Sequence, residues 1–138
     1  MMDTTLGLLE VLPRLLAPEM YSKSSLQDKI SLYFVDHSIV PLMVHENYAF
    51  CRPIHTNNAR SPQEKEWITV EALSRAAEYI SDGDLVDTQI HQQQTWSVAP
   101  LHGVLSTVAP CFFMQGHRSR MDAFPTYDTT AGGMRARC

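Results

Sequence analysis

The sequence predicts an all-α fold, a helical bundle that forms one domain or a piece of a larger one, on three observations. Apolar residues recur at helical spacing along most of the 138-residue chain. Residues that cap helices stand ahead of several of these segments. The alternation of apolar and polar residues that is typical of half-buried strands is sparse. Because 44% of the residues are apolar and 19% are charged, the chain can form a hydrophobic core.

Two helices are predicted in the first 36 residues. The first begins at Asp3 or Thr4, and Pro13 should kink or break it, because the proline ring clashes with the carbonyl four residues earlier. Four leucines form its expected buried face: Leu6, Leu9, Leu12 and Leu16. The second helix follows Ser25, which forms a capping box with Asp28, and should end near residue 36.

A short buried helix is predicted from Pro41 to Phe50. This segment is apolar on nearly all sides, and proline fits a first helical turn. Residues 51–62 contain two prolines and two asparagines without an apolar repeat, so we expect a loop there. A loop of this kind lies at the surface, where insertions are tolerated.

The clearest helix is predicted from Pro62 to Ile80. Ser61 and Glu64 form a second capping box ahead of it, and proline again occupies the first turn. Four apolar residues then form a seam for a neighbouring helix: Val70, Leu73, Ala77 and Ile80. The small side chain of Ala76 allows that neighbour to approach closely.

Three aspartates around Gly83 are predicted to form a corner between two helices. Gly83 supplies the left-handed residue that commonly ends a helix, and Asp84 can cap the next helix with Asp87 near its N-terminus. A calcium loop is the alternative, but the twelfth residue counted from Asp82 is Gln93, where a carboxylate is needed. The corner is therefore favoured, and a β-branched residue in place of Gly83 should destabilise it.

The last predicted helix follows Trp96 and Ser97. Four apolar residues mark its expected buried face: Leu101, Val104, Leu105 and Val108. No formally charged residue lies between Asp87 and Arg118, but prolines and polar residues in this stretch argue against a membrane span. The apolar periodicity ends after Pro110.

The motifs of several enzyme classes are missing from the sequence. No Gly-Lys dipeptide occurs in the 138 residues, which excludes a phosphate-binding GxxxxGK[ST] loop within them. His45 begins a sequence like the zinc-protease motif HExxH, but Ala49 stands where the second histidine is needed. The net charge of −4 argues against a domain held on nucleic acid by its own charge. No catalytic, cofactor-binding or metal-binding residue is therefore assigned.

A zinc site is one alternative that the residues leave open. Cys51 with His55, and Cys111 with His117, could supply two cysteines and two histidines. Nothing in the sequence brings these two pairs together, and buried cysteines with surface histidines are the commoner outcome. Three cysteines without close pairing favour a reduced, intracellular compartment.

Two ordered motifs lie in "LQDKISLYFVDHSIVPLMVHENY" and "LSRAAEYISDGDLVDTQIHQQQTWSVAP". Together they resemble the C-terminal region of the large subunit of replication factor C, the eukaryotic clamp loader. The structural positions of the family pattern are matched here by Pro41, Glu46, Asn47, Tyr48, Gly83, Asp84, Asp87 and Trp96. The "FPTY" segment at Phe124 to Tyr127 resembles a further element of that family, whose following helices are absent.

This resemblance implies a partial, helical, collar-like region over residues 1–127, of the kind that follows the AAA+ modules, and a disordered or unrelated tail over 128–138. It implies that the chain is a fragment of the large subunit and contributes to assembly of the AAA+ complex. In that family the complex loads the sliding clamp onto primer–template DNA in DNA replication and repair, so the expected location is the nucleus. The expected partners are the small subunits, with the clamp and the DNA reached through the whole complex, and no membrane.

The resemblance also implies that ATP and magnesium bind elsewhere in the parent protein, so the chain is not expected to be an enzyme by itself or to hold a cofactor. Two alternatives remain: a self-contained small helical protein-interaction module without a clamp-loader role, and a zinc-stabilised domain. For a fragment, we expect incompletely covered apolar seams and therefore loose packing or self-association unless partner subunits cover them.

Overall fold

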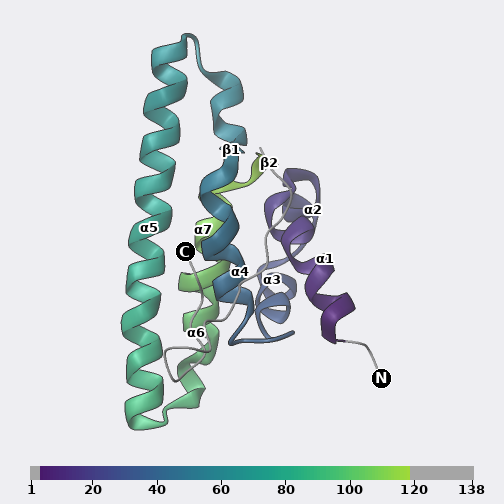
Figure 1. Cartoon of the computed structure of the whole chain (residues 1–138), viewed down its shortest axis with the longest axis vertical. Helices are drawn as coiled ribbons and strands as arrows, with labels where there is room; N and C mark the ends of the chain where they lie inside the picture. The colour runs from purple at the N-terminus through teal and green to yellow at the C-terminus, as the bar shows by residue number, and fades with distance from the viewer. Residues whose placement is uncertain (1–3, 119–138) are drawn as a thin grey trace, which may run out of the picture.

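The computed structural model describes residues 4–118 and is mainly helical, which confirms the predicted all-α class (Figure 1). The α-helices are α1 (Thr4–Leu16), α2 (Pro18–Lys23), α3 (Leu26–Tyr33), α4 (Val40–Asn47), α5 (Pro62–Gln93), α6 (Ala99–Gly103) and α7 (Ala109–Met114). Turns of 3₁₀-helix cover Tyr48–Phe50, Ile54–Asn58 and Trp96–Val98, and a π-helical turn covers Val104–Val108. Two short strands are β1 (Cys51–Pro53) and β2 (Gly116–Arg118). The "FPTY" segment and the predicted tail lie outside the described residues.

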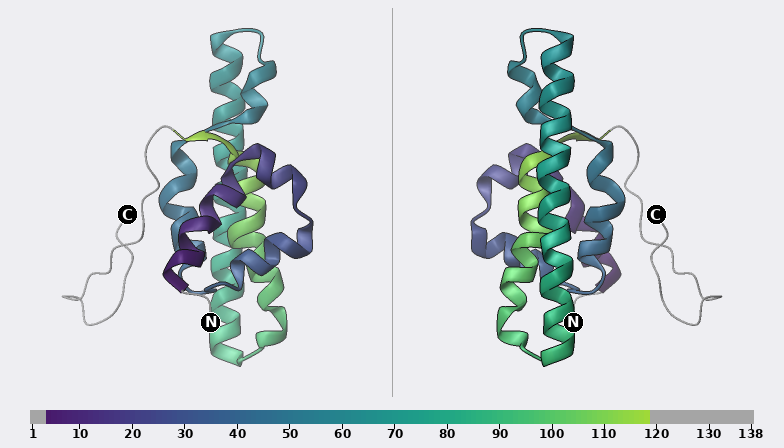
Figure 2. Two further views of the ribbon diagram at one scale, coloured as in Figure 1. Left: turned by 90° about the vertical axis from the view of Figure 1, so that its right-hand side faces the viewer. Right: turned by 90° about the vertical axis from the view of Figure 1, so that its left-hand side faces the viewer.

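Helix α5 is 32 residues long and forms one side of the molecule (Figures 1 and 2). The helical run from Trp96 to Met114 returns beside it, so α6, the π turn and α7 cover one face of α5. Helices α1, α3 and α4 pack against this returning run from the other side. The returning run is therefore the centre of the bundle, and α5 is an outer helix.

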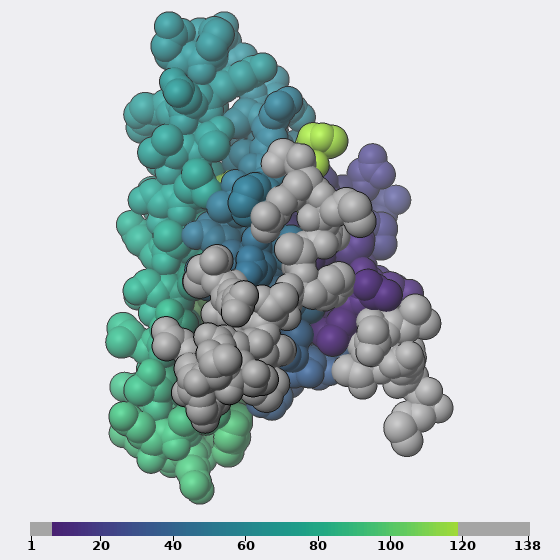
Figure 3. All heavy atoms as spheres, viewed as in Figure 1, coloured from purple at the N-terminus to yellow at the C-terminus, as the bar shows by residue number. Residues whose placement is uncertain are grey.

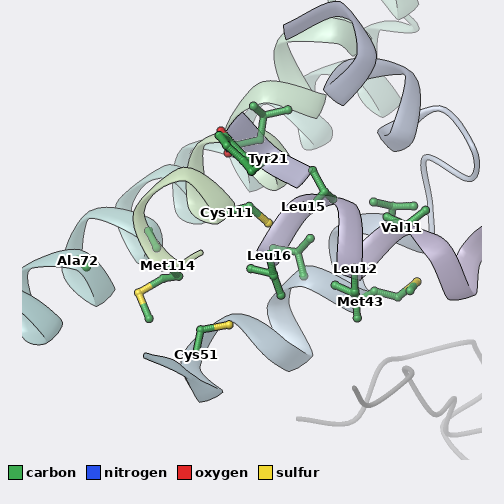
Figure 4. Close-up of a cluster of buried hydrophobic side chains, with 14 residues drawn as sticks. Val11, Leu12, Leu15, Leu16, Tyr21, Met43, Cys51, Ala72, Cys111 and Met114 are labelled. Carbon is green, nitrogen blue, oxygen red and sulfur yellow. The ribbon is translucent and has the colours of Figure 1, made fainter. Parts of the chain in front are cut away.

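The hydrophobic core lies where α1, α4, α5 and α7 meet (Figure 4). Its fully or almost fully buried side chains include Val11, Leu12, Leu15, Leu16, Met43, Val44, Ala76, Cys111 and Met114. The valine, leucine and methionine side chains among them each contribute about 1.5–3 kcal/mol relative to exposure. Packing of distant segments, more than helix propensity, therefore holds these short helices in place.

Helix α1 continues through Pro13, so of the two predicted effects of this proline, a kink or a break, the break is wrong. The Ala17 N–H donates to the Pro13 carbonyl at 3.1 Å, and helical bonding therefore resumes after the proline. The predicted buried face is also partly wrong, because Leu9 is 50% exposed. Leu12 and Leu16 are buried as predicted, and Val11 and Leu15, which the prediction left out, are buried beside them and make the face broader. Leu6 lies in α1, but its side chain is outside the described part of the structure.

Both predicted capping boxes stand at the starts of their helices. The Ser25 side chain accepts from the Asp28 N–H at 3.1 Å, and the Asp28 carboxylate accepts from the Ser25 N–H at 3.2 Å. Before α5, the Ser61 hydroxyl accepts from the Glu64 N–H at 3.1 Å, while the Glu64 carboxylate accepts instead from the Arg60 N–H. The first box is confirmed in full, and the second is confirmed on the serine side.

The predicted loop after α4 contains a strand that the sequence does not signal. β1 pairs antiparallel with β2 in the register Cys51↔Arg118, Arg52↔His117 and Pro53↔Gly116, and the Ile54 N–H donates to the Gln115 carbonyl at 2.8 Å. A Cβ at Gly116 would overlap the Arg52 carbonyl oxygen. This ribbon joins the start of the α4–α5 connection to the end of α7, and three residues per strand are too few for a visible alternation.

The predicted corner at Gly83 is wrong. Helix α5 runs without interruption from Pro62 to Gln93, and the left-handed residue that ends it is Gln94, with φ 53°. Asp84 therefore caps no helix. Gly83 is buried inside α5, where a Cβ would lie 3.3 Å from the Ser106 nitrogen. Its missing side chain lets the returning helix approach closely, which offsets the cost of about 1 kcal/mol for glycine in a helix interior.

The final helical run extends to Met114, four residues beyond Pro110. Within the π turn, the Ala109 N–H donates to the Val104 carbonyl five residues earlier. Of the predicted buried face, Val108 is buried and Leu101 is exposed. By length and composition Trp96–Met114 would suffice to cross a membrane, but half of this segment is buried inside the described fold, as expected for a helix of a protein core.

Candidate interaction surface

The face of α5 opposite the returning run is uncovered by any other element of residues 4–118. In the right-hand view of Figure 2, α5 stands in front of the bundle along its whole length, and it forms one entire edge of the space-filling view in Figure 3. The buried residues of α5 follow a single line on the inner face: Ala72, Ala76, Gly83 and Ile90. All four are apolar, and three of them are alanine or glycine, so the inner face packs closely.

The outer face of α5 carries a line of exposed, uncharged residues that we call the outer stripe: Trp67, Val70, Ser74, Ala77, Ser81 and Leu85. Their spacing of three or four residues places them on one side of the helix. Trp67, Val70 and Leu85 are 64%, 63% and 67% exposed. Large apolar side chains gathered along one exposed face are typical of a protein–protein contact.

The outer stripe has large residues at its ends and small ones between them. A shallow groove of about 300 Å³ lies beside Trp67 and Val70, with Ser74, Glu71 and Arg75 completing its lining. Arg75 lies 3.8 Å from Glu71, one helical turn away. Spacing of three and four residues is also the spacing of a coiled-coil seam, so the stripe has the form of a docking site for a helix.

The predicted seam on α5 is thus divided between two faces. Leu73 and Ile80 are half-buried toward the bundle, whereas Val70 and Ala77 belong to the exposed outer stripe. Trp67 and Leu85 also belong to this stripe and were not part of the predicted seam. The signal for them was present, because no charged residue occurs among the six positions of the stripe from 67 to 85.

A second exposed apolar group lies where α5 turns into the returning run. Trp96, Val98 and Leu101 are all exposed there. The Trp96 ring meets the rings of His37 and His91 edge-on, with centroids 5.9 and 5.6 Å apart. These contacts orient Trp96 at the end of α5 while leaving half of its surface open.

Near this end, a polar contact joins α3, α5 and α6. The Tyr33 hydroxyl lies 2.6 Å from His102 Nδ1, and His102 Nε2 lies 4.0 Å from Asp87 Oδ1. Asp87 Oδ1 is also 3.3 Å from His91 Nε2. A Cβ at Gly103 would come within 2.8 Å of the Tyr33 ring. The contact therefore fixes α3 against the returning run.

Both rings of this contact are neutral near pH 7, and burial widens the pH range over which each of them stays neutral. It raises the pKa of Tyr33 to about 12, with the Asp87 charge as a smaller cause. Burial also lowers the pKa of His102 below its ordinary value, and His37 and His91 act in the same direction, while Asp87 and Asp84 oppose the shift. Because Nε2 faces the Asp87 carboxylate, the tautomer of neutral His102 with its proton on Nε2 is favoured, and in that tautomer Nδ1 accepts from the Tyr33 hydroxyl.

We expect the stability of the chain to fall as the pH decreases below about 6.5, the ordinary pKa of histidine. Because the folded-state pKa of His102 is the lower one, the unfolded chain binds this proton more readily. The contribution of His102 to stability is therefore complete above the unfolded pKa and is lost as the pH falls through the folded pKa. Thermal unfolding from pH 8 to pH 5, in about 0.15 M salt, measures this dependence. A His102→Gln variant should show a weaker pH dependence, and equal slopes for variant and parent would contradict the assignment.

The structural positions of the family motifs fall into two groups. Pro41, Glu46 and Asn47 lie on α4, and Tyr48 follows it; the buried Asn47 amide donates to the Met43 carbonyl at 2.7 Å. Gly83, Asp84 and Asp87 lie along α5, and Trp96 follows its end. The two groups do not form one site. Asp87 and Trp96 take part in the contacts at the lower end of α5, whereas Asp84 is exposed on it.

The hypothesised zinc site is not assembled. Cys51 and Cys111 are buried in the hydrophobic core (Figure 4), whereas His55 and His117 are exposed. Burial, with a smaller effect of Cys51, raises the pKa of the Cys111 thiol well above its ordinary value, so it is held as a thiol, and zinc binds the thiolate. Across residues 4–118, no three histidine, cysteine or acidic side chains are grouped closely enough to hold a metal ion.

Comparison with known proteins connects this fold to one family. A family model described as "Replication factor RFC1 C terminal domain" matches residues 80–130. Replication factor C subunit 1 from Homo sapiens is 37% identical over 91% of the chain, that from Schizosaccharomyces pombe 41% over 77%, and that from Saccharomyces cerevisiae 43% over 67%. The chain covers 10%, 11% and 10% of these three proteins, so it spans about a tenth of the length of the curated relatives it matches.

Proposed function

Since this chain is homologous to the C-terminal region of the replication factor C large subunit, we propose that it is a non-catalytic helical module that assembles into that clamp loader. The observation that carries the proposal is the outer stripe of α5. An exposed line of uncharged residues on a long outer helix is suited to helix–helix contact with another subunit. The proposed partners are the small subunits of the complex.

In this role the chain would be a rigid structural element and would not catalyse a reaction. Its core joins α1, α4, α5 and α7, so the outer stripe is presented on a helix that is braced from behind. The proposed complex loads the sliding clamp onto primer–template DNA during replication and repair in the nucleus. ATP and magnesium would be bound by other parts of the complex, and the clamp and DNA would be reached through the assembled complex.

A self-contained helical interaction module is the second candidate, because the outer stripe would serve it equally well. The two functions differ in the partner. Mixing the purified chain with the small subunits and separating the mixture by size-exclusion chromatography tests the proposal. We expect the chain to elute with at least one small subunit; separate elution of the chain from all of them would contradict the clamp-loader role and favour the second candidate.

The purified chain is expected neither to bind ATP tightly nor to hydrolyse it. The physical reason is the missing Gly-Lys phosphate loop, whose amides and lysine hold the β- and γ-phosphates in P-loop enzymes. Phosphate release measured at each stage of purification checks this. Turnover that remains with the chain through successive columns and disappears on mutation of one of its own residues would overturn the non-catalytic assignment.

A further inference from the structure

Carboxylates border the outer stripe of α5 on both sides. By helical geometry, Glu71, Glu78 and Asp82 lie along one edge, and Glu66 and Asp84 lie along the other. All five residues are exposed. The one cation near these edges, among the residues of α5, is Arg75, which lies 3.8 Å from Glu71. The stripe is therefore an uncharged strip between two acidic rims.

The acidity of the chain is concentrated in this one helix. α5 contains seven carboxylates, at positions 64, 66, 71, 78, 82, 84 and 87, against two cations, Lys65 and Arg75. The whole chain contains 15 carboxylates and 11 lysines or arginines, so the other segments together are close to neutral. The negative potential therefore lies along the same helix that presents the uncovered apolar line.

We propose that the outer stripe accepts an amphipathic helix whose apolar face is flanked by lysine or arginine residues. The inference rests on the assembly role proposed above and specifies the chemistry of the partner. The apolar line provides the contact area, and the acidic rims pair with the flanking cations. Complementary charge of this kind steers association and fixes the register of the two helices.

The shape of the stripe fits such a helix. Ser74, Ala77 and Ser81 form its middle, and their small side chains allow a second helix to approach closely. Trp67 and Val70 at one end and Leu85 at the other mark a contact length of about 27 Å, which a partner helix of about 18 residues would span. The groove of about 300 Å³ beside Trp67 and Val70 can take one large apolar side chain of the partner.

A second copy of the chain fits this surface less well. Two α5 helices docked stripe to stripe would place acidic rims beside acidic rims in a parallel or an antiparallel arrangement. Like charges facing each other disfavour such pairing. The charge pattern therefore selects a basic partner over self-association.

Two synthetic helical peptides of about 18 residues test the inference directly. Both carry the same leucine and alanine seam, but one has lysine at the flanking positions and the other has glutamate. We expect the purified chain to bind the lysine-flanked peptide at least about tenfold more tightly, and this preference to shrink as salt is raised from about 0.05 M to about 0.5 M. Equal binding of the two peptides, binding of neither, or dimerisation of the chain through the stripe at low salt would overturn the inference.

Matched variants distinguish the contribution of the outer stripe to peptide binding from that of its acidic rims. Glu78→Gln/Asp82→Asn should weaken binding of the lysine-flanked peptide by about three- to tenfold, since it removes two exposed charge pairs from one rim. The control Glu10→Gln/Glu19→Gln removes the same charge elsewhere and should leave binding unchanged. Val70→Gln/Leu85→Gln keeps the carboxylates of both rims and should still lose binding of the peptide. Unchanged peptide affinity of this variant would mean that charge attraction alone holds the peptide, and it would contradict the inference.

The outcomes also separate this inference from the proposed function. If the chain elutes with the small subunits but shows no preference between the two peptides, the assembly role stands and the basic partner is wrong. If the lysine-flanked peptide binds at the stripe but no small subunit elutes with the chain, the partner chemistry stands and the clamp-loader role is wrong.

Discussion

Replacing Gly83 with valine is expected to destabilise the chain by about 1–3 kcal/mol, the usual cost of overpacking a close contact. A Cβ at this position would lie 3.3 Å from the Ser106 nitrogen and 3.5 Å from the Leu105 carbonyl carbon. These are backbone atoms of the returning helix, so they cannot move aside as a side chain can. The two γ-methyl groups of valine would extend further into the same contact and force the two helices apart.

Gly83→Ala is expected to have a smaller effect than valine, because the gain of about 1 kcal/mol in helix propensity opposes the tight contact. Ser81→Val is the matched control, since Ser81 is exposed on the same helix and a β-branched residue costs only about 0.5 kcal/mol there. Asp82→Asn should likewise be nearly neutral. Urea unfolding of the four variants measures the differences. Equal free energies of unfolding for Gly83→Val and Ser81→Val would contradict the close approach of the two helices at Gly83.

Replacing Leu15 with alanine is expected to destabilise the chain by about 2–5 kcal/mol, the range measured for leucine truncation in well-packed cores. Leu15 is fully buried in the cluster where α1 meets α4 and α7. In Figure 4 it lies among Leu12, Leu16 and Cys111. Truncation would leave a cavity lined by residues from three helices, and these cannot all collapse to fill it.

Leu9→Ala on the same helix is the control, with an expected loss of about 1 kcal/mol or less because half of this side chain is exposed. The pair also decides which face of α1 is buried, since the sequence places Leu9 on the inner side and the structure does not. Thermal unfolding of both variants provides the measurement. A larger loss for Leu9→Ala than for Leu15→Ala would mean that the face assigned to the core is wrong.

Local sequence signals predicted where helices begin. The predictions that were wrong concerned features that tertiary packing determines. Ser25 with Asp28, and Ser61 before α5, act on neighbouring backbone groups, so three or four residues of sequence contain the whole interaction. In the sequence, Gly83 is compatible with two different structures. A glycine can end a helix, or it can allow a neighbouring helix to pack closely against its own. Only the contact with Ser106 shows that Gly83 does the second.

The candidate site could be predicted only in part for a related reason. The seam drawn through Val70 and Leu73 runs along the border of the buried face, with Leu73 half-buried and Val70 exposed, because residues three apart on a helix lie on adjoining sides of it. The buried line is built from Ala72, Ala76 and Gly83, whose small side chains give a weak hydrophobic signal. Trp67 and Leu85 are the stronger apolar residues, yet they lie outside. Hydrophobicity alone therefore predicted the buried side of α5 only in part: Leu73 and Ile80 are half-buried, whereas Val70 and Ala77 are exposed.

The central claim, that the outer stripe of α5 docks the chain onto the small subunits of the clamp loader, is tested most directly by Val70→Gln/Leu85→Gln. Both side chains are exposed, so the variant should fold like the parent, which circular dichroism and thermal unfolding can verify. Leu26→Gln is the matched control, because Leu26 is a similarly exposed leucine on α3. Co-elution with the small subunits is the measurement: we expect Val70→Gln/Leu85→Gln to lose it and Leu26→Gln to retain it. Undiminished co-elution of the folded double variant would contradict the claim.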